Sequence, residues 1–203
     1  MFIAFEGLES SGKSTQARRL AAFLAERGHA VEAFAEPGTT ELGRGVRELV
    51  LHRQMAVEPL AELLLYEAAR AQLSAERVRP ALAAGRVVIA DRFSLSTLAY
   101  QGHGRGLDLD RVRALDAWAT GGLVPDLTLY FDIPLEEMRR RQGPAHRPDR
   151  LEREDAAFFE RVRDGYLCEL EGLPGAHRLD GGQPPEALFE QVKALALALL
   201  DGS

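Results

Sequence analysis

Cysteine and long apolar runs are both nearly absent from the 203-residue sequence. Cys168 is the single cysteine, so no disulfide can form within the chain, and a reducing, cytoplasmic setting is expected. The longest uninterrupted apolar run covers residues 194–200, well short of the ~20 residues that cross a bilayer. We therefore expect no membrane span and no signal peptide.

Lysine is also scarce, because Lys13 and Lys193 are the only lysines among 25 basic residues. The 31 acidic residues leave a net charge of -6, which disfavours a nucleic-acid backbone as a partner. Any anion that binds must therefore be held by a local group of charges. Lys13 is the conspicuous candidate for such a group.

Hydrophobic residues make up 46% of the chain and charged residues 28%, as in ordinary globular proteins. Strands are expected at residues 1–6, 30–35, 87–90, 127–131 and 177–179. Helical patterns cover residues 13–27, 42–50, 59–84, 109–119, 134–141, 154–170 and 186–200. This alternation predicts an α/β fold with a three-layer, doubly wound parallel sheet, formed by one domain over residues 1–203.

Residues 142–153 fit neither pattern. The segment has two prolines, one glycine and several basic residues without apolar spacing. It is therefore predicted to be a mobile loop between two helices.

Residues 7–14 match the phosphate-binding motif G-x-x-x-x-G-K-[ST] and stand between a predicted strand and a predicted helix. Glycines let backbone N–H groups turn toward a β-phosphate, where the helix N-terminus adds partial positive charge. Lys13 would bridge the β- and γ-phosphates, and the Ser14 hydroxyl would ligate Mg²⁺. The predicted ATP-binding residues of this segment are Gly7, Leu8, Glu9, Ser10, Ser11, Gly12, Lys13, Ser14 and Thr15.

The apolar strand at 87–90 leads into Asp91, which is expected to face the phosphate-binding loop and to hold the metal through water. Arg92 follows directly. A basic side chain in that crevice suits a second phosphate, so this pair predicts two phosphorylated ligands.

The phosphate-binding motif fits two classes of P-loop protein: a kinase with a small acceptor, and a GTPase-type switch that binds partners. A guanine-specific switch needs an N-K-x-D motif, which neither lysine supplies. A motor or a large ATPase would need a longer chain. A P-loop scaffold without turnover stays open, and an assay of ATP consumption would separate it from a kinase.

Six motifs in order resemble those of bacterial thymidylate kinases over nearly the whole chain. They are FEGLESSGKST at 5–15, EPGTTELG at 36–43, AARAQ at 68–72, DRFSLSTLAYQG at 91–102, PDLTLYFD at 125–132 and DRLE at 149–152. The resemblance implies a P-loop nucleoside monophosphate kinase fold and a homodimer. It also implies transfer of the γ-phosphoryl group of Mg·ATP to the 5′-phosphate of dTMP, which gives dTDP and ADP in dTTP biosynthesis.

The resemblance also implies the acceptor site. Glu9 corresponds to the acidic residue that meets the sugar 3′-hydroxyl, Tyr66 to the aromatic that stacks on thymine, and Arg70 and Arg92 to the arginines that hold the phosphate and the base. The other implied substrate-binding residues are Glu36 and Pro37, Arg47 at a phosphate, Ser96, Thr97 and Gln101 around the base, and Tyr100 beside the sugar 2′ position. Without the resemblance, Arg70 would be read as a solvated charge, and Tyr66 and Tyr100 as packing residues.

Three positions depart from the family pattern. Ala35 stands where an arginine often precedes EPG, Thr39 replaces the second glycine of EPGGT, and Tyr66 replaces the commoner phenylalanine. These changes concern the acceptor site and not the reaction. Deoxynucleoside kinases and other nucleoside monophosphate kinases are the alternative reading, because they use the same architecture for other acceptors.

The positive charge for the transfer must come from outside the phosphate-binding loop, because no arginine follows Glu9 as it does in some relatives. We expect residues 142–153, the lid loop, to close over ATP and to bring Arg147 or Arg150 to the transferred phosphoryl group. Arg141 is expected to lie against the adenine. Lys13, Arg92, Arg147 and Arg150 are thus the predicted catalytic residues, and a merely solvated charged loop is the alternative.

Overall fold

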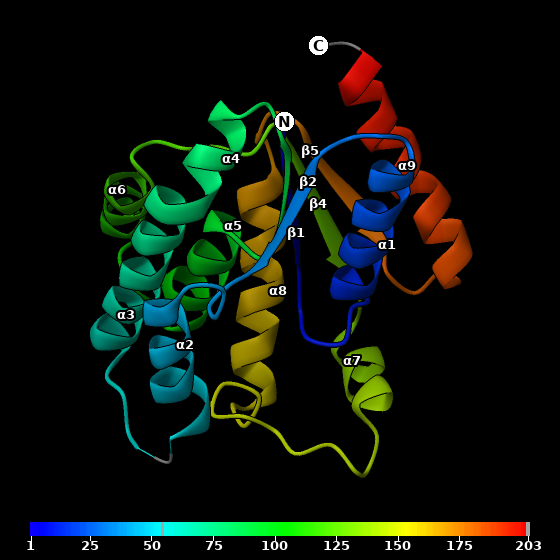
Figure 1. The fold of residues 1–203 in the computed structure, drawn as a ribbon. Coiled ribbons are helices and arrows are strands. Elements are labelled where there is room, and N and C mark those ends of the chain that lie inside the picture. The colour runs from blue at the N-terminus through cyan, green and yellow to red at the C-terminus, as the bar shows by residue number, and fades with distance from the viewer. Residues whose placement is uncertain (54, 202–203) are drawn as a thin grey trace.

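The computed structural model describes residues 1–53 and 55–201, and its centre is one sheet of five parallel strands (Figure 1). The strand order is β2-β3-β1-β4-β5. The strands are β1 (Phe2–Gly7), β2 (Val31–Ala35), β3 (Val87–Asp91), β4 (Leu127–Asp132) and β5 (Ala176–Asp180). All the strands predicted from the sequence are confirmed, with ends that shift by no more than one residue.

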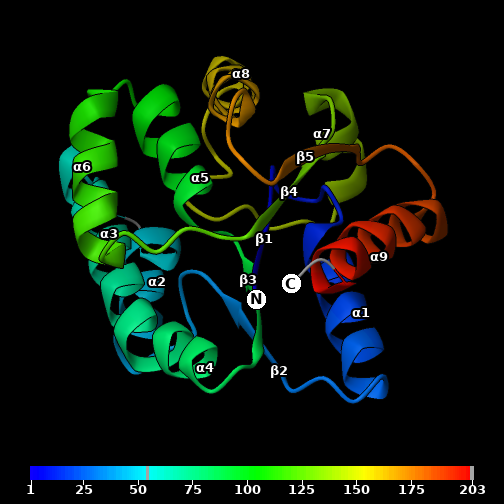
Figure 2. The same cartoon turned by 90° about the horizontal axis from the view of Figure 1, so that it is seen from above.

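Helices cover both faces of the sheet, as the view from above shows (Figure 2). One face carries α1 (Lys13–Glu26) and α9 (Pro185–Asp201). The helices on the other side are α2 (Glu41–Arg47), α3 (Pro59–Leu73), α4 (Arg79–Ala83), α5 (Ser94–Thr97), α6 (Leu109–Thr120) and α8 (Ala156–Leu170). The predicted three-layer, doubly wound α/β fold is therefore confirmed.

The central strands are apolar on both faces because both faces are covered. Phe5 of β1 packs with Leu20 of α1 and Val192 of α9, whereas Ala4 of the same strand packs with Leu73 of α3 on the opposite side. Burying a side chain the size of Leu20 or Phe5 contributes roughly 1.5–3 kcal/mol. This packing fixes the strand ends from which the functional loops begin.

The segment predicted as one helix at 59–84 is helical over residues 59–83, but its backbone hydrogen-bond pattern changes from α-helical to π-helical and back. α3 leads into the π-helical turn η2 (Ser74–Val78), and α4 follows directly. Pro80 stands in the first turn of α4. A proline has no N–H to donate and its ring clashes with the carbonyl four residues earlier, so the regular ladder cannot run through this position. The predicted helix at 42–50 is likewise α2 followed by a π-helical turn, η1 (Glu48–His52).

The sequence patterns missed a helical segment that follows β3. It consists of α5 and the π-helical η3 (Leu98–Gly104). At Gly104, a Cβ would lie 2.7 Å from a Val162 side-chain atom and 2.8 Å from one of Phe158. The glycine that weakens the helical signal is thus what lets α8 pack closely against η3.

The lid loop lies between α7 (Leu135–Gln142) and α8 and holds neither a helix nor a strand at residues 143–153, as predicted. Its action as a lid stays a prediction. Across residues 1–53 and 55–201, no helix combines the length and the apolar character needed to span a membrane.

Candidate functional site

The phosphate-binding motif forms a tight loop between β1 and α1. Gly7 has φ 144°, and a Cβ there would lie 2.6 Å from the Phe131 carbonyl oxygen, so the position requires glycine. Gly12, with φ 94°, directly precedes Lys13, the first residue of α1. The N-terminus of α1 therefore opens at the strand ends, as it does in phosphate sites.

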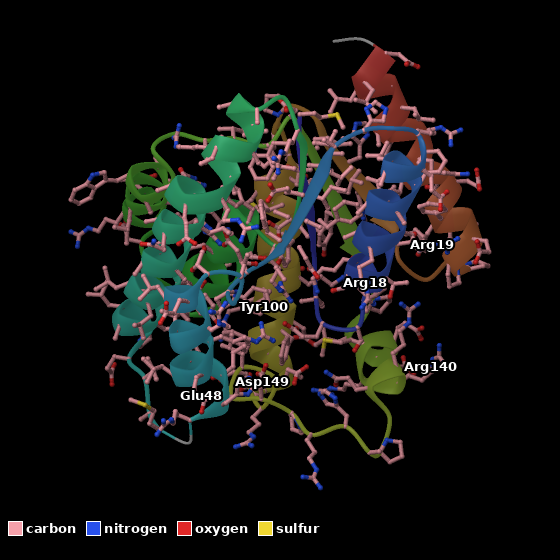
Figure 3. The ribbon with its side chains drawn as sticks, in the orientation of Figure 1. Arg18, Arg19, Glu48, Tyr100, Arg140 and Asp149 are labelled. Atoms are coloured by element: carbon pink, nitrogen blue, oxygen red, sulfur yellow. The ribbon has the colours of Figure 1, made fainter. Side chains whose placement is uncertain are left out.

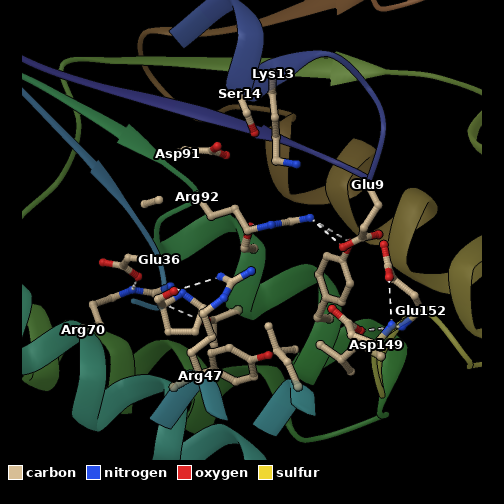
Figure 4. Close-up of a pocket in the computed structure, with 18 of the residues that line it drawn as sticks. Glu9, Lys13, Ser14, Glu36, Arg47, Arg70, Asp91, Arg92, Asp149 and Glu152 are labelled. Atoms are coloured by element: carbon tan, nitrogen blue, oxygen red, sulfur yellow. Dashed lines mark hydrogen bonds and ion pairs between the residues drawn. The ribbon is translucent and has the colours of Figure 1, made fainter. Parts of the chain in front are cut away.

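A cavity of about 350 Å³ lies at the carboxyl ends of β1, β2 and β3. Its lining contains every predicted substrate-binding residue together with the key residues of the phosphate-binding motif. Figure 4 shows most of this lining. The predicted residues in this lining are Glu9, Ser10, Lys13, Ser14, Glu36, Pro37, Arg47, Tyr66, Arg70, Asp91, Arg92, Ser96, Thr97, Tyr100 and Gln101. Segments that are far apart in the sequence thus meet around one space.

Lys13 is buried on one side of this cavity. Its Nζ donates a hydrogen bond to the Leu8 carbonyl oxygen at 3.3 Å, and none of the described residues forms an ion pair with it. Burial, and next the charge of Arg92, lower the pKa of Lys13 to about 8, against the opposing effect of Asp91 and Glu9. An anionic ligand beside the amine would raise this pKa again.

Ser14 and Asp91 lie on the same side of the cavity as Lys13 (Figure 4). Within residues 1–53 and 55–201, the Asp91 carboxylate accepts no hydrogen bond and forms no ion pair. A free carboxylate and a hydroxyl are oxygen ligands of the kind that Mg²⁺ prefers. The donor set therefore fits a magnesium ion that is bound together with a nucleotide.

Arg92 lies between the side of the cavity that holds Lys13 and Asp91 and the side that holds Arg47 and Arg70 (Figure 4). Its Nη2 donates to Glu9 Oε1 at 2.7 Å and its Nη1 to the Tyr166 hydroxyl at 3.0 Å. The Tyr100 hydroxyl donates to both Glu9 carboxylate oxygens at 2.8 Å. The backbone of Arg92 has φ 74°, a conformation that costs about 1–3 kcal/mol outside glycine and often marks a functional site.

Arg70 is held by acceptors on several sides and is almost fully buried. Its Nε donates to Glu36 at 2.8 Å, and its Nη2 donates to the Phe93 carbonyl oxygen at 3.0 Å. Its Nη1 contacts Glu67 at 3.2 Å and Asp116 at 2.8 Å. The guanidinium position is therefore fixed before any ligand arrives.

The carboxylates around Arg70 outnumber its single charge. Burial raises the pKa of Glu36 to about 7 although Arg70 opposes the shift, and burial also raises the pKa of Glu67. Arg47 differs, because it donates to the Pro37 carbonyl oxygen at 3.0 Å and has no ion pair among the described residues. Arg47, Arg92 and Lys13 are therefore better placed to attract a phosphate than Arg70.

The predicted base-pocket residues differ in how their polar atoms are engaged. The Ser96 hydroxyl donates to Glu6 and lies 2.8 Å from the Tyr166 hydroxyl. The Thr97 hydroxyl accepts from Arg70 Nη1 at 2.6 Å. Gln101 Nε2 donates to Glu62 Oε1 at 2.9 Å. Ser96 and Thr97 thus form the wall of the pocket with hydroxyls that already have protein partners.

The predicted lid arginines are not brought into this cavity. Arg150 forms an ion pair with Glu62 and donates to the Val50 carbonyl oxygen at 2.6 Å, and Arg147 is exposed. Arg141 donates to the Ser10 carbonyl oxygen at 3.2 Å, so it lies beside the phosphate-binding loop. The charge attraction of a buried carboxylate on α3 explains where Arg150 lies.

Two acidic residues of the lid loop line the cavity and are not among the predicted site residues. They are Asp149 and Glu152, whose side chains each accept a hydrogen bond from the other's backbone N–H, at 3.0 and 2.9 Å. Figure 3 shows Asp149 and Tyr100 below the sheet, between the α2 side and the α7 side. The DRLE motif at 149–152 contains both acidic residues, but it was interpreted through Arg150 alone.

Comparisons with known proteins show the family to which the chain belongs. The family model described as thymidylate kinase matches residues 5–192. A thymidylate kinase of Gloeobacter violaceus is 47% identical, with 96% of this chain and 93% of the relative covered, and one of Chlorobium chlorochromatii is 40% identical with the same coverage. A crystal structure of thymidylate kinase from Ehrlichia chaffeensis has a TM-score of 0.79 at 30% identity and covers 97% of this chain and 98% of that one.

Proposed function

The chain belongs to the thymidylate kinase family and phosphorylates dTMP to dTDP with ATP, and we propose that the two nucleotides react in the cavity beside the phosphate-binding loop. One observation carries this assignment. Lys13 and Asp91 line the same cavity as Arg92 and Tyr100, which the sequence assigns to the acceptor. One domain, residues 1–203, would hold both nucleotides.

ATP binds with its phosphates on the loop before α1. Backbone N–H groups of the loop hold the β-phosphate, and Lys13 reaches the β- and γ-phosphates. Ser14 and Asp91 would hold Mg²⁺, which supplies neutralisation of the phosphate charge. Arg141 lies beside Ser10 of the loop, which supports its assignment to the adenine side.

The acceptor phosphate binds to Arg92 and Arg47. Arg92 has one ion-pair partner, Glu9, and Arg47 has none among the described residues, so both can serve an incoming phosphate. Glu9, held by Arg92 and by the Tyr100 hydroxyl, is positioned for the sugar 3′-hydroxyl. This network binds and orients dTMP before transfer.

The base lies between Tyr66 and the wall formed by Arg70, Ser96 and Thr97. Arg70 is immobilised and its charge is already offset by three carboxylates, so it serves as a directional hydrogen-bond donor to the base more than as a phosphate ligand. The Tyr100 ring lies beside the sugar and leaves no room for a 2′-hydroxyl.

Transfer needs no side-chain nucleophile. An oxygen of the dTMP 5′-phosphate attacks the γ-phosphorus of ATP as the bond from that phosphorus to the β,γ-bridging oxygen breaks, and ADP leaves with that oxygen. Lys13 and Arg92 stabilise the charge that spreads over the transferred group. Closure of the lid loop brings Arg147 or Arg150 to the same group and excludes water. Arg150 must leave Glu62 to do so.

The chain acts as a cytoplasmic homodimer. Leu42 of α2, Leu60 and Leu64 of α3 and Trp118 of α6 are exposed, Trp118 at 84%, and these helices pack against one another on one side of the molecule (Figure 1). A second copy would cover this apolar surface. Cys168 is exposed as a free thiol, which suits a reducing compartment.

The assignment is tested with ATP and a panel of deoxyribo- and ribonucleoside monophosphates, with dTDP formation followed by chromatography. Wild type should prefer dTMP over its ribo analogue. Tyr100→Ala should lower this preference at least about tenfold, because the cavity it leaves admits the 2′-hydroxyl. Tyr100→Phe, which keeps the ring, should preserve it. An unchanged preference in Tyr100→Ala would contradict the placement of the sugar.

A further inference from the structure

The Gln101 side chain can present either of two chemically opposite ends to a base. Gln101 belongs to η3, is 3% exposed and lines the cavity. Its Nε2 is engaged by Glu62 at 2.9 Å, and none of the residues in 1–53 and 55–201 donates a hydrogen bond to its Oε1. Because the hydroxyls of Ser96 and Thr97 have protein partners, Gln101 Oε1 is the unengaged polar atom of this group.

Glu62 determines which end of the amide is turned toward the protein. It belongs to α3 and has a side chain that is 0% exposed. Besides Gln101 it accepts from Arg105, at 3.2 Å from Nε and 3.0 Å from Nη2, and from Arg150. Burial alone would raise the pKa of Glu62, but these hydrogen bonds outweigh burial and lower it. Glu62 is therefore an ionised carboxylate at neutral pH, which can only accept hydrogen bonds.

The Glu62 carboxylate, which can only accept hydrogen bonds, fixes the orientation of the Gln101 side-chain amide. If Gln101 turned over, its Oε1 would face the Glu62 carboxylate, which would replace a hydrogen bond with repulsion between oxygens in a buried site. The Nε2 end must therefore point to Glu62, and the Oε1 end is left for the ligand. Arg105 keeps Glu62 in place, and a further ion pair with Glu154 at 2.7 Å holds Arg105.

We infer that Glu62 is a positioning residue that makes Gln101 offer a hydrogen-bond acceptor to the base, and thereby selects pyrimidines that carry an N3–H. This inference rests on the proposed placement of dTMP in the cavity. Thymine and uracil have a donor at N3, whereas cytosine has a lone pair there. Cytosine would therefore set an acceptor against Gln101 Oε1, and a buried polar mismatch of this kind discriminates strongly.

Glu62→Gln tests the role of the carboxylate with little change in shape. A glutamine offers both a donor and an acceptor, so Gln101 becomes free to turn over and to accommodate cytosine. The ratio of kcat/KM for dTMP to that for dCMP should fall at least about tenfold, mainly through the two KM values. Because Arg150 also binds Glu62, any change in kcat should be the same for both substrates and cancel in the ratio. The matched control is Glu154→Gln, which weakens the same Arg105 network without touching Gln101, and its ratio should stay within about twofold of wild type.

Gln101→Met provides a second route if Glu62→Gln does not fold, as judged by circular dichroism and thermal unfolding. Removal of the amide should lower the dTMP/dCMP ratio to a similar extent. Glu62→Gln added to Gln101→Met should then change the ratio no further, because Glu62 acts through the amide. If Glu62 had only a structural role, its substitution would lower the thermal stability but would not change the dTMP/dCMP ratio in this way.

Two failures can be told apart. A wild-type enzyme that lacks preference for dTMP would contradict the placement of dTMP in this cavity. A wild-type enzyme that prefers dTMP, together with a folded Glu62→Gln or Gln101→Met variant whose ratio stays within twofold of wild type, would overturn the positioning role alone.

Discussion

The acceptor side of the cavity and the lid loop differ in how their arginines are held. Arg70 and Arg92 are fixed by several hydrogen bonds within the cavity, and Arg92 even has a costly backbone conformation. In the lid loop, Arg147 is exposed and Arg150 is bound to Glu62 outside the cavity. In the proposed mechanism, the arginines of the acceptor side are therefore held in place before the ligand binds, whereas the last positive charge for transfer would arrive by a movement of the lid loop.

Removal of the lid arginines should produce the largest effect. The double variant Arg147→Ala/Arg150→Ala should lower kcat about 10³-fold, because an arginine delivered to the transferred phosphoryl group is worth at least that much. Steady-state kinetics at saturating ATP and dTMP measure it. The control Arg153→Ala removes a neighbouring cation of the same loop. If the double variant turned over within a few-fold of wild type, the transfer charge would have to come from the preorganised side.

Lys13→Ala should lower kcat by about 10²- to 10³-fold, because the amine stabilises charge that develops on the transferred group. The chain offers a matched control in Lys193→Ala, the only other lysine, which pairs with Glu190 on the surface of α9. Kinetics and thermal unfolding should be compared for both variants. More than about a tenth of wild-type turnover in Lys13→Ala would mean that the phosphates do not bind at this loop.

Arg70→Met sharpens the comparison through stability. It leaves Glu36, Glu67 and Asp116 without their shared cation in a buried site, and should lower the free energy of unfolding by about 3–5 kcal/mol. Arg77→Met, which breaks a partly exposed pair with Glu32, should cost at most about 1 kcal/mol. Urea denaturation measures both, and equal small losses would show that the Arg70 cluster is not preorganised.

A further expected effect is a dependence of stability on pH at Glu36. Its pKa is about 7 in the folded chain against 4.5 ordinarily, so the folded state binds more protons than the unfolded state in that window. The free energy of unfolding contributed by this group therefore falls as pH rises from 4.5 to 7. Glu36→Gln should make the fall shallower in denaturation curves measured across this range, and parallel curves for the two proteins would argue against it.

Motifs at strand ends allowed the sequence to identify residues that line one cavity, while their roles in binding and transfer stay predictions. Asp91 ends the short strand β3, Arg92 directly follows it and Lys13 comes after β1, and parallel strands bring such ends together. It missed the helical segment at 94–104 because Gly102 and Gly104 weaken the helical signal, and their role in packing is visible only in three dimensions.

The partners of buried charges were also beyond the reach of sequence patterns. Glu62 meets Gln101, Arg105 and Arg150, which are separated from it by 39 to 88 positions, and no spacing rule relates them. The same applies to Arg150, whose motif was recognised although its ion-pair partner was not. Sequence motifs identify chemical groups, whereas the folded chain decides which of them are already engaged.

In the proposed mechanism, the acceptor site is formed before binding, whereas a lid-loop arginine arrives only for transfer. The most direct test of this contrast is the affinity for dTMP in the absence of ATP. Calorimetric titration of dTMP into wild type, Arg92→Ala and Arg147→Ala should give a Kd at least about tenfold weaker for Arg92→Ala and within about twofold of wild type for Arg147→Ala. The opposite pattern, with Arg147→Ala weakened and Arg92→Ala unchanged, would contradict the account.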